Sequence, residues 1–86
     1  MSRWKIVEYK LKNNSRNITF SEMVILLEHY GYKQDNMGKT SGSRVRFVLY
    51  GHADILLHRP HPQKELKEYM IKDLRNLIEQ EGFWNE

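Results

Sequence analysis

Residues 44–58 read RVRFVLYGHADILLH, and this stretch decides the fold. Its first half alternates between apolar and polar side chains, which is typical of a strand with one buried face. One face carries Val45, Phe47 and Leu49, and the other carries Arg44, Arg46, Val48 and Tyr50. Beyond Gly51, Ile55 and Leu57 alternate in the same way with Asp54, Leu56 and His58. The stretch therefore predicts an antiparallel hairpin with one apolar face and one polar face.

The length of the hairpin loop sets which residues face each other. Because side chains alternate with a period of two, an odd loop keeps both apolar faces together, whereas a two-residue loop would place Asp54 in the core. We predict a loop of three residues, 51–53. The expected partners are then Leu49 with Ile55, Phe47 with Leu57, and Arg46 with His58.

Helical spacing dominates the chain before the hairpin. The first predicted helix covers 3–12 and presents Trp4, Val7 and Leu11 on one face. A second helix follows Thr19, which forms a capping box with Glu22: the hydroxyl accepts from the backbone at Glu22, and the carboxylate reaches back. Its apolar face carries Phe20, Met23, Val24, Leu27 and Tyr30. Gly31 ends it, since glycine readily adopts the left-handed conformation found after helix ends.

The remaining elements complete an α+β fold. A strand-like segment starts at Tyr32, and a polar turn, 39–43, separates it from the hairpin. Pro62 is predicted as the first residue of a long helix, because its missing amide proton costs nothing there. That helix buries Leu66, Met70, Leu74, Leu77 and Ile78, ends at Gly82, and has Phe83 folded back on it. We expect a three-stranded antiparallel sheet packed on helices, with an N-terminal helical extension, 1–18, and one domain, 19–86.

Composition restricts the class of function. The chain has 86 residues and a net charge of +3. Because it has no cysteine, disulfides, cysteine-ligated zinc and thiol catalysis are excluded. No window approaches the roughly 18 apolar residues of a membrane span, and the start lacks a signal-peptide hydrophobic region, so we expect a cytoplasmic protein. Basic residues outnumber acidic ones in 1–20, 33–46 and 58–75, whereas 76–86 is acidic. This segregation favours a surface that binds a polyanion.

The densest chemistry lies in 58–67, HRPHPQKELK. If a helix begins here, its free amide protons and dipole favour a phosphate near His61 and Lys64. Neighbouring cations favour a neutral imidazole, so His58 or His61 can act as a general base. The matching reaction is attack of a ribose 2′-hydroxyl on the adjacent phosphorus, with Arg or Lys countering the phosphorane charge. No cofactor or metal is needed for it.

Ordinary structural roles compete with these assignments. His61 beside a helix start is also suited to capping that helix, and His58 also fits an exposed strand position. The two imidazoles form an HxxH pair, but two prolines interrupt it and no cysteine or nearby carboxylate completes a tetrahedron, so we expect no metal site. Nothing orients Ser41 or Ser43 as a nucleophile.

Three motifs carry a resemblance to a known family. They are Leu26-Leu27 to Gly31-Tyr32, the Gly42-Ser43 turn before a strand, and Pro60-His61 followed by Lys64-Glu65-Leu66-Lys67, Ile71, Leu74 and Gly82. In residues 20–83 the chain resembles the HicA toxins, whose small fold is similar to that of double-stranded RNA-binding domains. The resemblance implies an mRNA-cleaving toxin, an mRNA interferase, held inactive by a HicB-like antitoxin that covers the RNA surface.

The sequence departs from the family at one position. Most HicA toxins carry a histidine regarded as catalytic after the glycine-serine pair, and this chain has Arg44 there. A guanidinium cannot act as a base at physiological pH, so the base is expected at His61 or His58. The residues expected to contact RNA phosphates are Arg44, Arg46, Arg59, Lys64 and Lys39.

Three functions remain open from the sequence. The first is a metal-independent endoribonuclease toxin. The second is a module that binds RNA, or only its antitoxin, without cleaving. The third is a structural or regulatory partner domain without RNA affinity, which a binding measurement at low salt separates from the other two.

Overall fold

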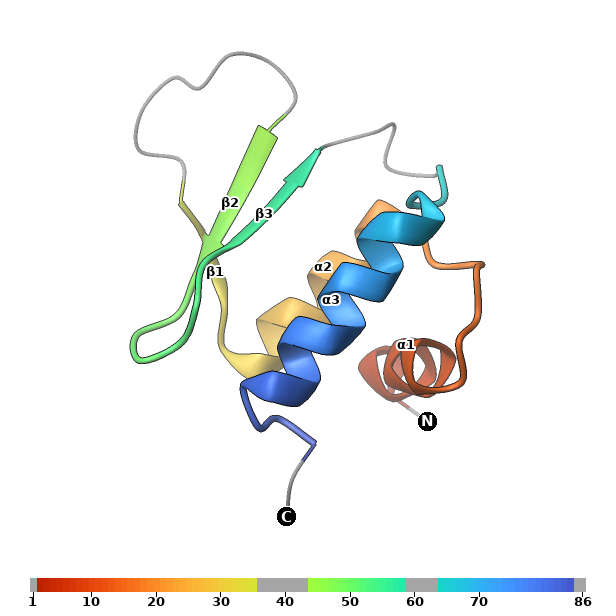
Figure 1. Ribbon diagram of the computed structural model, residues 1–86, viewed down its shortest axis with the longest axis horizontal. Helices are drawn as coiled ribbons and strands as arrows, with labels where there is room; N and C mark the ends of the chain where they lie inside the picture. The colour runs from red at the N-terminus through yellow and green to blue at the C-terminus, as the bar shows by residue number, and fades with distance from the viewer. Residues whose placement is uncertain (1, 36–43, 59–63, 85–86) are drawn as a thin grey trace.

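The structure is a computed structural model that describes residues 2–35, 44–58 and 64–84. Its elements, in chain order, are α1 Arg3–Lys12, α2 Phe20–Tyr30, β1 Lys33–Asp35, β2 Arg44–Val48, β3 Ile55–His58 and α3 Glu68–Gln80. The strands form one antiparallel sheet in the order β1-β2-β3. The helices lie on one side of this sheet (Figure 1). The α+β class and the predicted order of elements are confirmed.

Local signals account for α2. The Thr19 hydroxyl accepts a hydrogen bond from the Glu22 backbone at 3.1 Å, and the Glu22 carboxylate accepts one from the Thr19 backbone at 2.9 Å, so the capping box is complete. Burial raises the pKa of Glu22, but the bonds from Thr19 and from Lys10 outweigh it and hold that pKa below its usual value. At the other end Gly31 has φ +106°, as the predicted helix end requires.

The core lies between the inner face of the sheet and the helices. The sheet contributes Val45, Phe47, Ile55 and Leu57, all predicted to face inward. They join the buried residues Val7, Leu11, Ile18, Phe20, Met23, Leu26, Leu27, Tyr32, Leu66, Met70, Ile71, Leu74 and Ile78. In the last helix, Ile71 is buried although it was not among the residues predicted to be buried. Leu77, which was among them, is only half-buried. Val7 and Leu11 come from α1, so this helix shares the core of residues 19–84, while a domain boundary after residue 18 stays a prediction.

The register of the hairpin differs from the prediction by two residues. Phe47 is the partner of Ile55 rather than of Leu57, so 49–54 connect the two strands. The shift is even, and every side chain therefore keeps its predicted face. Arg46 consequently lies opposite Leu56, and the predicted pairing of Arg46 with His58 is wrong.

Residues far from 49–54 in the sequence bind this longer connection and fix its position. The Tyr32 hydroxyl donates to the Ala53 carbonyl at 2.9 Å, and the Ala53 amide donates to the Glu81 carboxylate at 3.3 Å. Leu49 packs beside Gly31 at the end of α2. These contacts replace the ladder bonds that a three-residue loop would have made, and no local pattern encodes them.

The last helix begins six residues later than predicted, at Glu68 instead of Pro62. Residues 64–66 run alongside 18–20 instead: the Leu66 amide donates to the Ile18 carbonyl at 2.8 Å, and the Phe20 amide donates to the Lys64 carbonyl at 3.3 Å. A single β-bridge joins Thr19 and Glu65. Because this pairing uses the backbone of 64–66, Leu66 is buried from an extended segment and not from a helical turn.

The C-terminal end of α3 forms as predicted. Gly82 has φ +85°, its amide donates to the Glu79 carbonyl at 3.1 Å, and the Phe83 amide donates to the Ile78 carbonyl at 3.3 Å. This pair of bonds is the Schellman motif, which turns Phe83 back onto the core. Phe83 stacks on Tyr30 at 4.6 Å and on His52 at 4.7 Å between ring centroids.

Candidate nucleic-acid interface

The hairpin register brings two of the expected site residues together. Arg44, the first residue of β2, is the Cα partner of His58, the last residue of β3. Both side chains are exposed and lie on the open face of the sheet, because their neighbours Val45 and Leu57 point into the core. Directly opposed residues of antiparallel strands have Cβ atoms about 4.5–5.5 Å apart, so one small group can contact both side chains.

The open face carries further charges along β1 and β2. Lys33 of β1 is the partner of Val48 and therefore lies on the same face as Arg46. Asp35 of β1 is opposite Arg46. Sequence reasoning missed Lys33, although the buried Tyr32 before it implied that Lys33 points outward.

The Arg46 guanidinium forms ion pairs within the protein. Its Nε donates to the Asp54 carboxylate at 3.0 Å, Nη2 contacts the same carboxylate, and Nη1 lies 4.0 Å from Asp35. The hydrogen bond and charge of Asp54, followed by the charge of Asp35, raise the pKa of Arg46 above its usual value. The two carboxylates compensate the guanidinium, so Arg46 offers less net attraction to a phosphate than sequence reasoning assumed.

Lys64 lies apart from the sheet face. It is exposed, on the segment that pairs with 18–20, and four residues before the first residue of α3. The prediction that Lys64 sits at a helix N-terminus is wrong, because α3 begins at Glu68. Lys39, Arg59 and His61 lie outside the described residues, so their predicted roles stay predictions.

The described histidines differ in their surroundings. His29 stacks on Trp4 with ring centroids 3.5 Å apart. His52 Nδ1 lies 2.8 Å from the Glu81 carboxylate. His58 is the described histidine that lies on the open sheet face. Among the residues that the structure describes, no cluster of three or more His, Asp or Glu side chains has metal-binding geometry.

Together these features allow one kind of chemistry. A guanidinium on β2 can hold a phosphate while an imidazole on β3 reaches the neighbouring ribose, and both side chains are exposed to solvent. An open sheet face with exposed Arg44 and His58 side chains suits a polymer better than a small enclosed substrate. The arrangement defines a small α+β protein with a candidate polyanion-binding face.

Comparison with known proteins identifies the family. The family model described as the HicA toxin of bacterial toxin-antitoxin systems matches residues 20–83. The chain therefore belongs to the HicA toxin family, and its α+β arrangement is the double-stranded-RNA-binding-domain-like fold of these toxins. Membership implies an antitoxin partner. Neither the curated proteins nor the solved structures gave a significant match.

In the described part of the chain, no helix is long and apolar enough to cross a membrane.

Proposed function

We propose that this protein is an RNA-cleaving toxin, a metal-independent endoribonuclease that acts on mRNA and is neutralised by a HicB-like antitoxin. The observation that carries the proposal is the pairing of Arg44 with His58 on the open sheet face. Family membership supports the toxin role.

The proposed reaction uses the two side chains in different roles. The His58 imidazole accepts the proton of a ribose 2′-hydroxyl, whose oxygen then forms a bond to the adjacent phosphorus. Arg44 binds the non-bridging phosphate oxygens and counters the charge that develops on them. The bond from phosphorus to the 5′-oxygen breaks, which leaves a 2′,3′-cyclic phosphate and a 5′-hydroxyl once the leaving oxygen takes a proton from water or from a second acid.

The pairing also offers an account of the departure from the family at residue 44. The resemblance implies a catalytic histidine at that position of β2, where this chain has Arg44. His58 occupies the opposite position on β3, so the exchange moves the imidazole across one strand pair while keeping it on the same face. His61 is the other candidate base, and it lies outside the described residues.

An exchange variant tests this account. In Arg44→His/His58→Arg the imidazole and guanidinium swap strands, and we expect cleavage within about tenfold of the unmodified protein. His58→Arg alone leaves two guanidinium groups and no imidazole in this pair, and if His58 is the base we expect a loss of roughly 100-fold or more. Cleavage is measured on purified protein and a defined RNA in chelator, with the cyclic phosphate end as the diagnostic product. An exchange variant as inactive as the single variant would contradict the assignment of His58.

His61→Ala separates the two candidate bases. We expect it to retain cleavage if His58 is the base. Lost cleavage in His61→Ala, together with normal cleavage in His58→Ala, would move the role to His61. In cells, induction of the toxin should arrest growth, and a HicB-like protein encoded by an adjacent reading frame should relieve the arrest on co-expression.

One observation favours a second function, RNA binding without cleavage. Residue 44 is an arginine, which binds phosphate but cannot accept a proton. This function predicts salt-dependent RNA retention and no cleavage products in chelator or with added metal ions.

A further inference from the structure

In the part of the chain that the structure describes, strand β3 forms an edge of the sheet. It pairs with β2, and within the described residues its other main-chain edge has no strand partner. Proteins usually protect such edges by keeping the strand very short, or with lysine, proline, a bulge or an inward-pointing charge, and β3 has four residues. Residues 55–58, ILLH, contain no lysine or proline, and Leu56 is 63% exposed. This edge is therefore able to accept a further strand.

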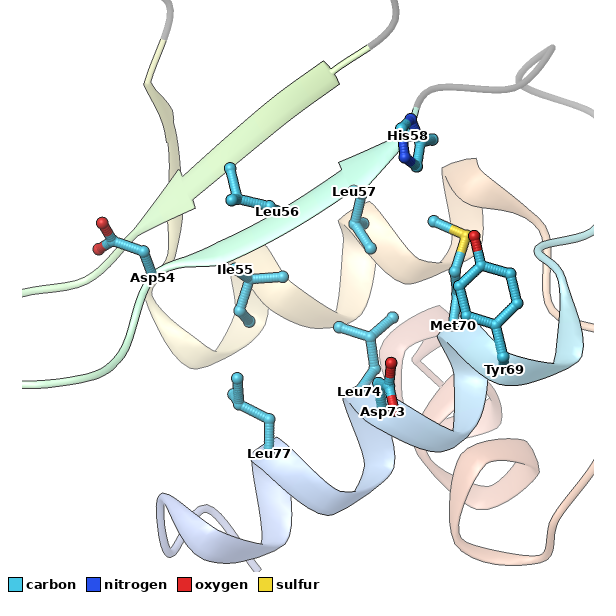
Figure 2. A pocket seen from close by; sticks show the side chains of 10 residues that line it. All are labelled: Asp54, Ile55, Leu56, Leu57, His58, Tyr69, Met70, Asp73, Leu74 and Leu77. Atoms are coloured by element: carbon cyan, nitrogen blue, oxygen red, sulfur yellow. The ribbon is translucent and has the colours of Figure 1, made fainter.

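A groove follows the same edge. It has a volume of about 270 Å³ and runs between β3 and α3, from Asp54–His58 on one side to Tyr69–Leu77 on the other. Ile55 and Leu57 point toward α3, whereas Leu56 points to the opposite side of the strand (Figure 2). Tyr69, on the helical side, is 56% exposed. A strand added here would place alternate side chains in the groove and the others beside Leu56.

The charge of the groove selects among ligands. Asp73 lines it from α3 and makes no ion pair with another residue in 2–35, 44–58 or 64–84. Asp54 lies at its other end and holds Arg46. Because Asp54 is already compensated by Arg46, Asp73 is the groove carboxylate that carries an uncompensated charge within the described residues, and it attracts lysine or arginine. An apolar groove with one uncompensated carboxylate beside an open strand edge fits an extended polypeptide that places a basic residue against Asp73.

We propose that this edge and groove bind an extended segment of the antitoxin, which adds to the sheet as a strand beside β3. The segment carries apolar residues at alternate positions and a lysine or arginine facing Asp73. Because the groove ends at His58, a bound segment lies against the imidazole proposed as the base and excludes RNA from it. This last step rests on the proposed ribonuclease function, whereas the binding itself does not.

The binding is tested with a short synthetic peptide of alternating lysine and valine and its glutamate–valine counterpart. Each is added to the full chain labelled with ¹⁵N, and backbone amide shifts and hydrogen exchange are recorded. We expect the lysine peptide to shift amides in 54–58 and 69–77 and to slow exchange in 55–58. The glutamate peptide should shift neither region. Equal effects of both peptides, no shift with either, or shifts confined to other regions would overturn the proposal.

Matched variants locate the charge that the peptide contacts. Asp73→Lys should weaken binding of the lysine peptide roughly fivefold or more. Glu79→Lys makes the same charge change at another exposed position of α3 outside the groove, and should leave binding unchanged. Leu56→Lys should also weaken binding, since it adds a charge beside the edge. Equal losses in Asp73→Lys and Glu79→Lys would show a general charge effect and contradict the proposed contact.

Two further measurements keep this proposal separate from the ribonuclease. A single-stranded RNA oligonucleotide should leave the groove amides of 69–77 unshifted, and shifts there would make the groove an RNA site and overturn the proposal. If the protein cleaves RNA, the lysine peptide should inhibit cleavage, and undiminished cleavage at saturating peptide would overturn the inhibitory step. If the protein cleaves no RNA, the ribonuclease assignment fails. The peptide-induced amide shifts still show whether the groove binds the peptide.

Discussion

The two ends of the β2–β3 hairpin place the same residue type in opposite surroundings. At the connection, 49–54, His52 lies against the Glu81 carboxylate and stacks on Phe83. At the other end His58 is exposed opposite Arg44. The His52 side chain is therefore held by contacts within the protein, whereas the His58 side chain is exposed to solvent. We propose His58 and not His52 as the base because of these surroundings, since the residue type is the same.

The sharpest test of this contrast replaces each histidine separately. His58→Ala should lower RNA cleavage roughly 100-fold or more, because a general base contributes at least that much, and should leave the unfolding midpoint unchanged. His52→Ala should do the reverse: it removes the contact with Glu81 and lowers the free energy of unfolding by about 1–2 kcal/mol, with normal cleavage per folded molecule. Cleavage assays and urea unfolding of both variants measure this. Lost cleavage in a well-folded His52→Ala protein would break the comparison.

A second prediction concerns the aromatic anchor of the connection. Phe83 stacks on Tyr30 and His52, and is half-buried. Phe83→Ala should lower the free energy of unfolding by about 2 kcal/mol, less than the roughly 3–5 kcal/mol of a fully buried phenylalanine. Tyr50→Ala is the control, because this side chain in the same connection is fully exposed and should change stability by less than about 0.5 kcal/mol. Similar losses in both variants would mean that Phe83 does not anchor the hairpin.

A smaller effect is expected at Tyr32, whose hydroxyl donates to the Ala53 carbonyl. Burial, and then the charges of Glu81 and Asp54, raise the pKa of Tyr32 above its usual value. Tyr32→Phe should cost about 1 kcal/mol at neutral pH. Since the folded-state pKa is raised, the contribution of the hydroxyl is complete below about pH 10 and is lost as the pH rises through the folded-state pKa.

Urea unfolding at several pH values checks this dependence. The stability difference between the unmodified protein and Tyr32→Phe should be constant below about pH 9 and shrink above about pH 10. A difference that grows above pH 10 has the opposite sign and would contradict the assignment.

The same contrast explains how far the sequence predicts the fold. The signals for α2 are local, since Thr19, Glu22 and Gly31 lie within or beside the helix that they define, and the prediction was correct. The face of every residue in β2 and β3 was also correct, because it depends only on parity. The register and the start of α3 were wrong, because Tyr32, Glu81 and residues 18–20 bind those segments from far along the chain.

For the site, the sequence identified the residue types but not their pairing. Arg44 and His58 were both named, yet their direct opposition follows from the observed register, which places His58 two residues away from its predicted partner Arg46. The compensation of Arg46 by Asp54 was missed for the same reason, since the predicted loop set His58 opposite Arg46 and left Asp54 without a role.

The smallest predicted effect concerns Asp54, at the end of the connection 49–54 and beside the open face of the sheet. Asp54, the last residue before β3, holds Arg46 and so cancels one charge of that face. Asp54→Asn should release this charge and raise the affinity for a single-stranded RNA oligonucleotide roughly threefold, with a salt dependence steeper by up to about 0.7 in the logarithmic slope. Glu79→Gln changes the net charge equally, away from the sheet, and should raise affinity much less. Fluorescence anisotropy at several salt concentrations measures both variants. Equal gains would show that RNA responds to net charge alone, whereas a gain confined to Asp54→Asn would extend the RNA-binding face from Arg44 and His58 to Arg46.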